Sequence, residues 1–154
     1  MILGVFVIFS AVFADQLAKY FVDTNIVSGQ PIEVFSLFNL VKVWNTGVSF
    51  SMFSHYGKVG AIVLSVLAIT VCLFLLHWMI KEKNLFKVVS LGLIIGGAIG
   101  NVIDRVRFGA VLDFLDFHIM DYHWPAFNLA DSFICIGAGV LIMWEIFYKQ
   151  KERI

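Results

Sequence analysis

Aspartates cluster in the second half of this chain. Five of its seven aspartates lie between Asp104 and Asp131. Two aspartates a few ångströms apart cannot both ionise easily, so they share a proton and titrate as a pair. Such a pair can activate water to hydrolyse a peptide bond without a metal or a nucleophilic side chain. It can also bind a cation or relay protons in a transporter, and residue types alone do not separate hydrolysis from transport. The D-T-G and D-S-G signatures of soluble aspartic proteases are absent from the sequence.

The composition is that of an integral membrane protein. Of 154 residues, 60% are hydrophobic and 14% are charged, and the mean hydropathy is +0.91. This balance is too apolar for an ordinary soluble domain. The formal net charge is zero, and no basic patch predicts a nucleic-acid partner. We interpret Cys72 and Cys135, which lie in long apolar runs, as small buried hydrophobes. No metal-ligand spacing is shown by the histidines, which are His55, His77, His118 and His123. We therefore expect no metal and no cofactor.

Four apolar runs predict an all-α integral membrane protein with one membrane domain, residues 1–154. The expected transmembrane helices span about residues 2–22, 58–80, 85–103 and 126–148. At about 1.5 Å per residue such runs cross roughly 30 Å of hydrocarbon. The first run can also be interpreted as a signal peptide, because residues 12–14 resemble a cleavage site. No basic segment precedes it and three more apolar runs follow, so we favour a retained helix.

The two long loops, residues 23–57 and 104–125, hold more structure than simple connectors need. Residues 32–35 and 39–44 are rich in β-branched and aromatic residues and predict short strands, followed by a turn at 45–47. This small sheet is either a plain surface element or a platform whose backbone holds an extended peptide.

Aromatic residues interleave with polar ones from residue 106 to 124 in the second loop. This pattern predicts an amphipathic segment that lies in the headgroup region of the membrane. If the segment is helical, Asp113 and Asp116 share a face.

Charged and amide side chains stand in two of the predicted helices. Asp15 and Lys19 share a face at i, i+4, where they either neutralise each other or contact a substrate. Asn101, Asp104 and Arg105 share a face at the end of the third helix. There they either cap the helix or orient a neighbouring catalytic group.

The fourth predicted helix carries Asn128, Asp131 and Ser132 on one face of its first two turns. Asp131 is expected one to two turns inside this apolar helix, where a carboxylate is usually functional. The third helix also carries small residues every four positions, a packing stripe of Gly92, Gly96 and Gly100.

The distribution of basic residues predicts the orientation in the membrane. Six lie in the turn after residue 80 and in the tail: Lys81, Lys83, Lys87, Lys149, Lys151 and Arg153. Four lie on the other side: Lys42, Lys58, Arg105 and Arg107. The positive-inside rule then places both termini in the cytoplasm and both long loops outside. The Asp113 and Asp131 carboxylates can thus meet near the outer leaflet.

Five motifs in the right order resemble those of the lipoprotein signal peptidases (signal peptidase II), a family of bacterial membrane-embedded aspartyl proteases. They are Asp15-Gln16-Leu17-Ala18-Lys19, Asn45-Thr46-Gly47-Val48-Ser49-Phe50, Gly96-Gly97-Ala98-Ile99-Gly100-Asn101-Val102-Ile103-Asp104-Arg105, Val111-Leu112-Asp113-Phe114 and Phe127-Asn128-Leu129-Ala130-Asp131-Ser132. Each motif alone is a weak signal, but together they run nearly end to end. Ser49 departs from the alanine that is commoner in the family, which affects nothing catalytic.

This resemblance implies four transmembrane helices, a small extracytoplasmic β cradle and an interfacial amphipathic segment in the bacterial cytoplasmic (inner) membrane. It implies cleavage of diacylglyceryl-modified prolipoproteins just before the lipidated cysteine, with membrane lipid as a partner and sensitivity to globomycin-type inhibitors. It assigns catalysis to Asp113 and Asp131, with Asp116 as the local competitor of Asp113. Supporting or substrate-binding roles fall to Asn45, Gly47, Asn101, Asp104, Arg105, Asn128, Asp15 and Lys19.

The expected mechanism is direct attack by water. One ionised aspartate takes a proton from water while the other, protonated, polarises the scissile carbonyl. The sequence does not say which of the two is protonated at rest. Two rival functions are a transporter with carboxylate relays and an assembly protein whose glycine stripe binds other helices. The chain shows no inverted repeat or broken helix, which many transporters have.

Overall fold

The computed structural model describes residues 1–47 and 57–147. Val48, Ser49 and Phe50 of the second motif, and the basic tail, lie outside the described residues. The helices are α1 (Ile2–Asn25), α2 (Gly57–Lys81), α3 (Leu85–Phe108) and α4 (Leu129–Phe147). All four are long and apolar enough to cross a membrane, which confirms a multi-pass membrane protein.

Three helix ends differ from the expected bounds. α1 continues to Asn25 and α3 to Phe108, beyond residues 22 and 103, and α4 begins at Leu129 instead of residue 126. α3 ends where Gly109 adopts φ 74°, a left-handed conformation that glycine takes without strain and that turns the chain toward the sheet. α4 starts late because Phe127 forms a β-bridge with Leu115 instead of joining the helix.

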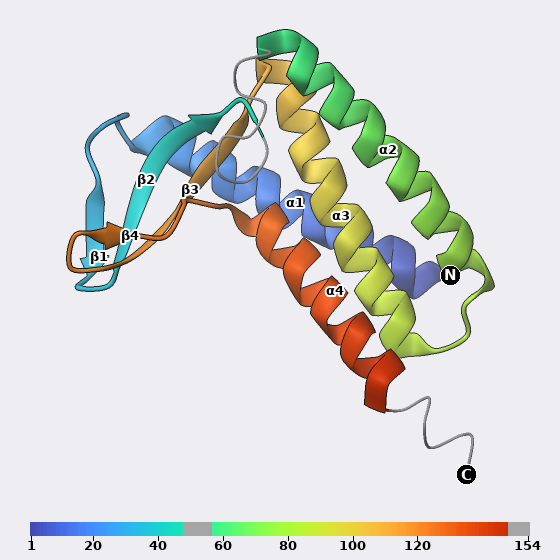
Figure 1. The fold of residues 1–154 in the computed structure, drawn as a ribbon. Helices are drawn as coiled ribbons and strands as arrows, with labels where there is room; N and C mark the ends of the chain where they lie inside the picture. The colour runs from blue at the N-terminus through green and yellow to red at the C-terminus, as the bar shows by residue number, and fades with distance from the viewer. Residues whose placement is uncertain (48–56, 148–154) are drawn as a thin grey trace.

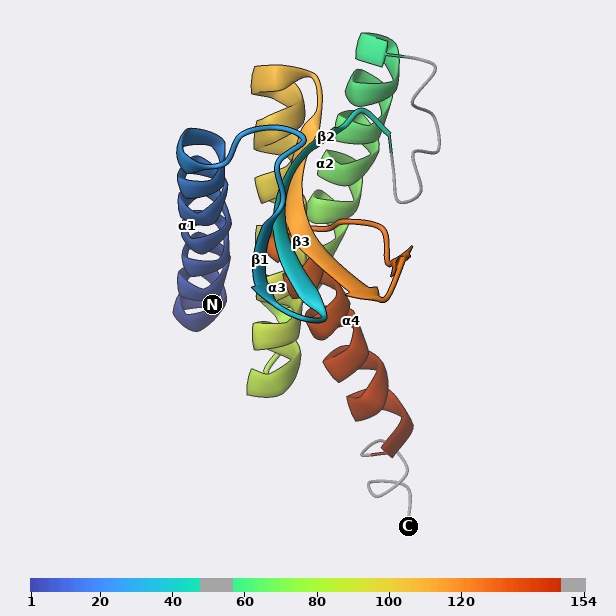
Figure 2. The ribbon, with the colours of Figure 1, turned by 90° about the vertical axis from the view of Figure 1, so that its left-hand side faces the viewer.

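α3 is the central helix of the bundle. It packs against each of the other three helices, as Figures 1 and 2 show from two sides. The glycine stripe of α3 lies against α1: Gly92 faces Val7 and Gly96 faces Ala11. Small residues at such positions let two backbones approach closely in lipid. The stripe is thus filled within the chain, which removes the main support for the assembly interpretation.

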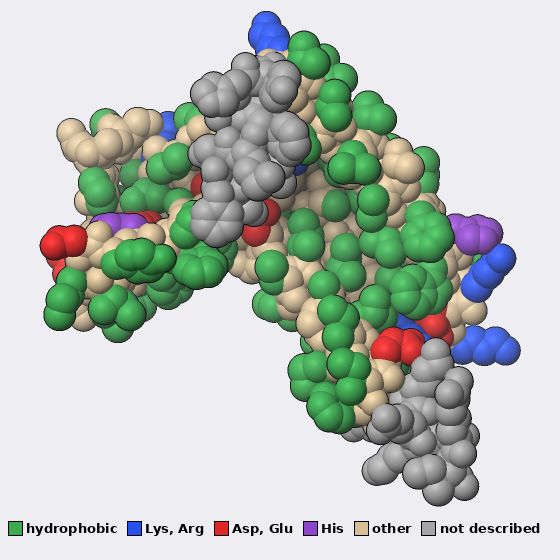
Figure 3. All heavy atoms as spheres, in the orientation of Figure 1, with side chains coloured by type: hydrophobic (Ala, Val, Ile, Leu, Met, Phe, Trp, Pro, Cys, Tyr) green, Lys and Arg blue, Asp and Glu red, His purple; other side chains and the backbone are tan. Residues whose placement is uncertain are grey.

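Hydrophobic side chains cover the exposed surfaces of α2 and α4 in the view of Figure 3. Val66, Leu73 and Phe74 on α2 are each more than half exposed. A soluble protein would bury side chains of this kind, whereas lipid covers them in a membrane.

The loops form one antiparallel sheet with the strand order β1-β2-β3-β4. The strands are β1 (Ile32–Phe35), β2 (Phe38–Asn45), β3 (Val111–Ile119) and β4 (Tyr122–His123). The two strands expected in the first loop are confirmed. The sheet lies at the end of the bundle opposite the start of α1 and the end of α4 (Figure 1).

Most of the segment at residues 106–124, predicted to be amphipathic and interfacial, is strand, so the alternative in which it is helical does not hold. β3 pairs with β2 along its length, with Val43 opposite Asp113 and Asn39 opposite Asp116. Interleaved aromatic and polar residues do not fix the secondary structure of such a segment, and pairing with β2 makes this one a strand. Successive side chains of a strand point to opposite faces, so Asp113 and Asp116, three residues apart, do not share a face.

Candidate active site

The first catalytic candidate, Asp113, lies near the start of β3 and is 3% exposed. Its Oδ2 accepts a hydrogen bond of 3.0 Å from Asn45 Nδ2, at the end of β2. Its Oδ1 accepts one of 2.7 Å from Asn128 Nδ2. Both carboxylate oxygens are therefore held by amides from two different parts of the chain.

The second candidate, Asp131, is the third residue of α4. It lies in the first turn, so its expected position one to two turns inside the helix is wrong. Its backbone N–H donates to Asn128 Oδ1 at 2.9 Å, and the backbone N–H of Asn128 donates to Asp131 Oδ2 at 3.3 Å. This reciprocal pair has the form of a capping box, which satisfies amides at a helix N-terminus. The other carboxylate oxygen, Oδ1, accepts from Asn101 Nδ2 at 2.8 Å.

Two amides link the two carboxylates. Asn128 is fully buried, and its Nδ2 donates both to Asp113 Oδ1 and, at 3.2 Å, to Asn101 Oδ1. Asn101 in turn donates to Asp131. A continuous chain of hydrogen bonds thus runs from Asp113 through Asn128 and Asn101 to Asp131, and it joins β3, α3 and α4.

A buried cation lies behind this chain of hydrogen bonds. Lys19 Nζ is 2.9 Å from Asp15 Oδ2, 2.8 Å from Asp104 Oδ2 and 3.1 Å from Asn101 Oδ1. Lys19 is 4% exposed, and both of its carboxylate partners are buried. A buried ammonium of this kind needs each of its three N–H groups satisfied, and these contacts supply three acceptors.

The two carboxylates that neutralise Lys19 also fasten the neighbouring elements. Asp15 Oδ1 accepts from the backbone N–H of Ala130 in α4 at 2.9 Å. Asp104 Oδ2 accepts from the backbone N–H of Leu112 in β3 at 3.2 Å. The cluster therefore positions the segments that carry both catalytic candidates.

Burial sets the acidity of Asp113. Loss of hydration raises the pKa of this carboxyl from 3.8 to about 6. The hydrogen bonds from Asn45 and Asn128 and the charge of Lys19 lower this pKa, whereas the charge of Asp131 raises it. Asp113 therefore keeps a proton in a pH range where an ordinary aspartate is ionised.

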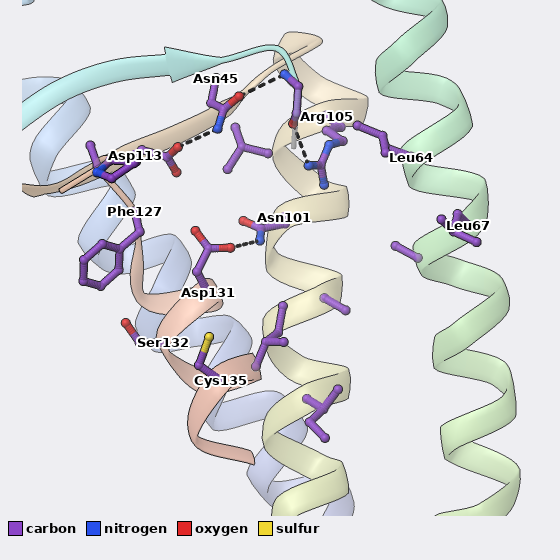
Figure 4. Close-up of a pocket in the computed structure, with 18 of the residues that line it drawn as sticks. Asn45, Leu64, Leu67, Asn101, Arg105, Asp113, Phe127, Asp131, Ser132 and Cys135 are labelled. Atoms are coloured by element: carbon purple, nitrogen blue, oxygen red, sulfur yellow. Dashed lines mark hydrogen bonds between the residues drawn. The ribbon is translucent and has the colours of Figure 1, made fainter. Parts of the chain in front are cut away.

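Asp113 and Asp131 both line one cavity of about 770 Å³. Figure 4 shows the two carboxylates pointing into it from β3 and α4, with Asn101 and Arg105 on α3 beside them. Away from the carboxylates the wall is apolar and comes from three helices: Leu64, Leu67, Ala68, Val71, Ile94, Ala98 and Ile134. The cavity thus has a polar end at the sheet, where both carboxylates lie, and an apolar end between the helices.

Arg105 and Gly47 line the polar end of the cavity. The Arg105 Nη2 donates to the carbonyl of Gly47 at 3.3 Å, and the Gly47 N–H donates to Asn45 Oδ1 at 2.9 Å. Because its Oδ1 is occupied in this way, the Asn45 amide must present its Nδ2 to Asp113. The turn predicted at residues 45–47 therefore orients one partner of the catalytic candidate.

Asp116 is set apart from this site. It accepts from Asn39 Nδ2 at 3.1 Å, lies 2.9 Å from His123 Nδ1 and lines neither described cavity at the site. The structure thus separates Asp116 from Asp113 by giving it partners within the sheet.

The two cysteines are free and differ in burial. Cys72 is buried, as expected, but Cys135 is exposed and lines the large cavity, so its expected burial is wrong. The reason is that this position of α4 faces the cavity and not a neighbouring helix.

All ten predicted site residues meet in this one network. One further member, Gln16, was not among the predicted residues; its Nε2 donates to Asp104 Oδ1 at 3.0 Å and to the Gly100 carbonyl at 3.3 Å. Its position between Asp15 and Lys19 in the first motif could have identified it as a member of the network. Pro125 and Ala126, which line the cavity, carried no signal because their side chains have no chemistry of their own.

Comparison with known proteins places this geometry in a family. The family model described as signal peptidase (SPase) II matches residues 7–147. The lipoprotein signal peptidase of Anaplasma phagocytophilum (strain HZ) is 41% identical over 145 residues, covering 94% of this chain and 92% of its own. The lipoprotein signal peptidase of Aeromonas hydrophila subsp. hydrophila is 43% identical over 142 residues, which cover 90% of this chain and 84% of that protein.

A solved structure agrees with this placement. A bacterial membrane enzyme determined by the in meso method has a TM-score of 0.84 and 33% identity, covering 93% of this chain and 87% of that chain. A second such structure has a TM-score of 0.81 over 94% of this chain and 92% of that chain, also at 33% identity. The chain therefore belongs to the signal peptidase II family and is an aspartic protease embedded in the membrane, of the type named lipoprotein signal peptidase.

Proposed function

We propose that this enzyme removes signal peptides from diacylglyceryl-modified prolipoproteins by an attack of water that Asp113 and Asp131 activate. The observation that carries the proposal is the placement of both carboxylates on one cavity, joined through Asn128 and Asn101. Two carboxylates in such a site share one proton, which gives the pair one acid and one base.

Asp113 is the acid of this pair and Asp131 the base. Burial and the Asp131 charge raise the pKa of Asp113, which favours the proton there. Asp131 accepts hydrogen bonds from Asn101 and from the N-terminal cap of α4, where the helix dipole favours negative charge.

The steps balance without any other reagent. The oxygen of a water molecule attacks the scissile carbonyl carbon while Asp131 takes a proton from that water. At the same time Asp113 gives its proton to the carbonyl oxygen. The gem-diol then collapses: Asp131 protonates the leaving amine, the C–N bond breaks, and Asp113 recovers a proton from a diol hydroxyl. Both residues end in their starting states, and no covalent bond to the enzyme forms.

The cavity suits a substrate that arrives through the bilayer. Its apolar wall between α2, α3 and α4 can hold acyl chains and a signal helix, while the carboxylates lie at its polar end. The cut then falls just before the lipidated cysteine, where the acyl chains join the polypeptide. Globomycin-type inhibitors, which the family resemblance suggests, are expected to compete for this cavity.

The orientation in the membrane follows from charge and fold. The α2–α3 turn carries basic residues, and Figure 1 shows this turn at the end of the bundle away from the sheet. We place this end and both termini in the cytoplasm, with the site near the outer leaflet of the inner membrane.

The test is a product map. Purified enzyme in lipid is given a diacylglyceryl-modified prolipoprotein, and mass spectrometry identifies the new N-terminus and the released signal peptide. We expect an N-terminal lipidated cysteine, equal rates with and without EDTA, and no hydroxamate when hydroxylamine is present. A hydroxamate on the signal peptide would contradict the absence of a covalent intermediate, and inhibition by EDTA that divalent metal reverses would contradict the metal-free mechanism. A cut at any other bond would contradict the proposed cleavage position.

A further inference from the structure

The segment that follows the β3–β4 turn and leads into α4 forms one wall of the large cavity. We refer to this segment, residues 122–128, as the strap. Four of its residues line the large cavity: Trp124, Pro125, Ala126 and Phe127. Pro125 and Ala126 also line a smaller cavity of about 240 Å³ at the end of β2. Both cavities reach Asp113, so the position of the strap shapes the space around this carboxylate.

The strap is bulged where it lines the cavities. At one end His123 pairs with His118, and at the other Phe127 pairs with Leu115. Between these pairs β3 has two residues, 116 and 117, whereas the strap has three, 124 to 126. An extra residue of this kind is a β-bulge, which disrupts the ladder locally and is frequent next to active sites. The bulged stretch therefore depends on the two ends of the strap for its position.

Backbone hydrogen bonds hold the end next to α4. The Phe127 carbonyl accepts from the N–H of Phe114 at 3.0 Å and from that of Leu115 at 2.8 Å. The Phe127 N–H donates to the Leu115 carbonyl at 3.1 Å. Asn128 follows directly and caps α4 through the N–H of Asp131. A change at the far end of the strap should therefore leave Asn128 in place.

A pair of side chains holds the far end. His123 Nδ1 lies 2.9 Å from each carboxylate oxygen of Asp116, and it carries the proton of this contact because a carboxylate only accepts. Asp116 is buried and is fixed in turn by Asn39 Nδ2 of β2 at 3.1 Å. The strand β4 consists of only Tyr122 and His123, so its ladder is short. The Asp116–His123 pair therefore fastens the strap where backbone pairing is brief.

This pair and the catalytic candidate Asp113 lie on opposite faces of the sheet. Asp113 and Asp116 are three residues apart on β3, and successive side chains of a strand alternate between faces. His123 contacts Asp116, whereas its neighbour Trp124 lines the large cavity. The pair can thus affect the cavity through the strap without contact with a substrate.

We propose that Asp116 and His123 are positioning residues for cleavage, which hold Trp124, Pro125 and Ala126 in the wall that receives the substrate. This inference rests on the proposed function, since it takes the cavity at Asp113 and Asp131 as the place of cleavage. Loss of the pair weakens substrate binding. The chemical step changes little, because Phe127 and Asn128 are held from the other end of the strap.

The test compares kcat and KM of the wild type, His123→Ala, Asp116→Ala and the double variant. Purified enzyme in lipid cleaves a diacylglyceryl-modified prolipoprotein. Each single variant should raise KM about fivefold or more and change kcat by less than about twofold, which is the pattern of lost uniform binding. The double variant should be no worse than either single variant, because the two side chains act through one contact.

His123→Asn is the conservative variant. The asparagine Nδ2 takes the place of the ring Nδ1 and can donate to Asp116, so KM should return to within about twofold of the wild type. Asp23→Ala is the matched control. It removes an ion pair of 2.7 Å that joins α1 to Lys42 of the sheet, and neither partner lines the two cavities. It should leave KM unchanged.

Amide hydrogen exchange locates the effect within the strap. The Trp124 N–H donates to the Phe117 carbonyl at 2.8 Å, next to His123. His123→Ala should speed exchange of the Trp124 amide and leave the Phe127 amide as protected as in the wild type. His123→Asn should restore protection at Trp124.

Unchanged KM in the single variants, additive losses in the double variant, or no recovery in His123→Asn would overturn the inference while the proposed function stands. Unchanged exchange at Trp124 would overturn it as well. An equal rise of KM in Asp23→Ala, or loss of folding in either single variant, would also do so, because the pair would then support the sheet as a whole. Cleavage by Asp113→Asn would instead overturn the proposed function.

Discussion

The Nζ of Lys19 lies 3.1 Å from Oδ1 of Asn101, and this contact decides which way the Asn101 amide points. With its oxygen held by the ammonium, the amide must turn its nitrogen to Asp131, where it donates at 2.8 Å. A residue of the first helix thereby orients the partner of Asp131, the proposed base, on the fourth helix. Lys19 is a positioning residue in this account, because it does not itself line the cavity.

The Lys19→Met change should be strongly destabilising. It leaves the buried carboxylates of Asp15 and Asp104 without their cation, and breaking a buried ion pair costs about 3–5 kcal/mol. Lys42→Met is the control, since its pair with Asp23 is partly exposed and such pairs contribute about 0–1 kcal/mol. Unfolding of the detergent-solubilised enzyme by SDS titration measures both. Equal losses in the two variants would mean that the Lys19 cluster is not a structural centre.

Asn128 has two separable tasks, which two substitutions distinguish. Asn128→Ser keeps an oxygen that can cap α4 but removes the Nδ2 donor to Asp113 and Asn101. Asp113 is protonated in the proposed resting state, and a hydrogen bond between neutral groups contributes about 0.5–1.5 kcal/mol, so kcat/KM should fall roughly 2- to 10-fold. The free energy of unfolding should fall less in Asn128→Ser than in Asn128→Ala. The alanine variant also loses the N-cap, which contributes about 1 kcal/mol. Wild-type kcat/KM in Asn128→Ser would contradict the linking role.

The pH dependence of cleavage should follow Asp113. Its proton is needed for the carbonyl oxygen, and its pKa is about 6, so kcat/KM of the free enzyme should fall as pH rises through about 6. The hydrogen bond from Asn45 lowers this pKa, so its removal in Asn45→Ala should move the alkaline limb to higher pH while lowering the maximum. A pH–rate profile of both enzymes measures the shift. A limb that moves to lower pH would contradict the assignment of Asp113 as the acid.

The same group makes stability depend on pH. The pKa of Asp113 is higher in the fold than its ordinary value of 3.8, so its favourable contribution is complete below pH 3.8 and is lost as pH rises through about 6. The raised pKa corresponds to about 3 kcal/mol between the two limits. Asp113→Asn cannot ionise, so the wild type should lose stability relative to this variant between pH 4 and pH 7. The free energy of unfolding of both enzymes is measured at pH 4 and at pH 7. The same difference between the two enzymes at both pH values would show that burial does not raise this pKa.

Close approach of α3 and α4 depends on Gly97. A methyl group at this position would overlap the carbonyl oxygen of Ala130 and crowd the side chain of Ile134. Gly97→Ala should therefore destabilise by about 1–3 kcal/mol and displace Asn101 from Asp131, with loss of activity. Gly139→Ala meets nothing within 4 Å and serves as the control, with a change within about 1 kcal/mol. Thermal unfolding in lipid compares them, and a tolerated Gly97→Ala would show that the helices can separate without harm.

The sequence predicted the parts of the fold that local pattern decides. Apolar runs locate the helices because crossing hydrocarbon requires length and hydrophobicity in one continuous segment. The strand β3 was not predicted, because its alternating aromatic and polar residues also suit a membrane surface, and pairing with β2 more than 60 residues away decided the outcome. Tertiary contacts of this kind leave no mark within a short window of sequence.

For the site, the residue types were predictable but their connections were not. The family motifs named Asp113, Asp131 and Asn128 as candidates, but not that the Asn128 amide joins Asp113 to Asn101 across α3, α4 and β3. Those contacts depend on how three elements pack. A second cavity of about 240 Å³ at the end of β2 could not be predicted either. Val43 and Ala126 line it together only because the sheet meets the segment that leads into α4.

Cleavage of a purified diacylglyceryl-modified prolipoprotein by four enzymes tests whether Asp113 and Asp131 together activate water. The four enzymes are the wild type, Asp113→Asn, Asp131→Asn and Asp116→Asn, each checked for folding by thermal unfolding in lipid. We expect Asp113→Asn and Asp131→Asn to abolish cleavage, whereas Asp116→Asn, whose partners lie within the sheet, should still cleave. Loss of cleavage in folded Asp116→Asn together with activity in Asp113→Asn would contradict this proposal.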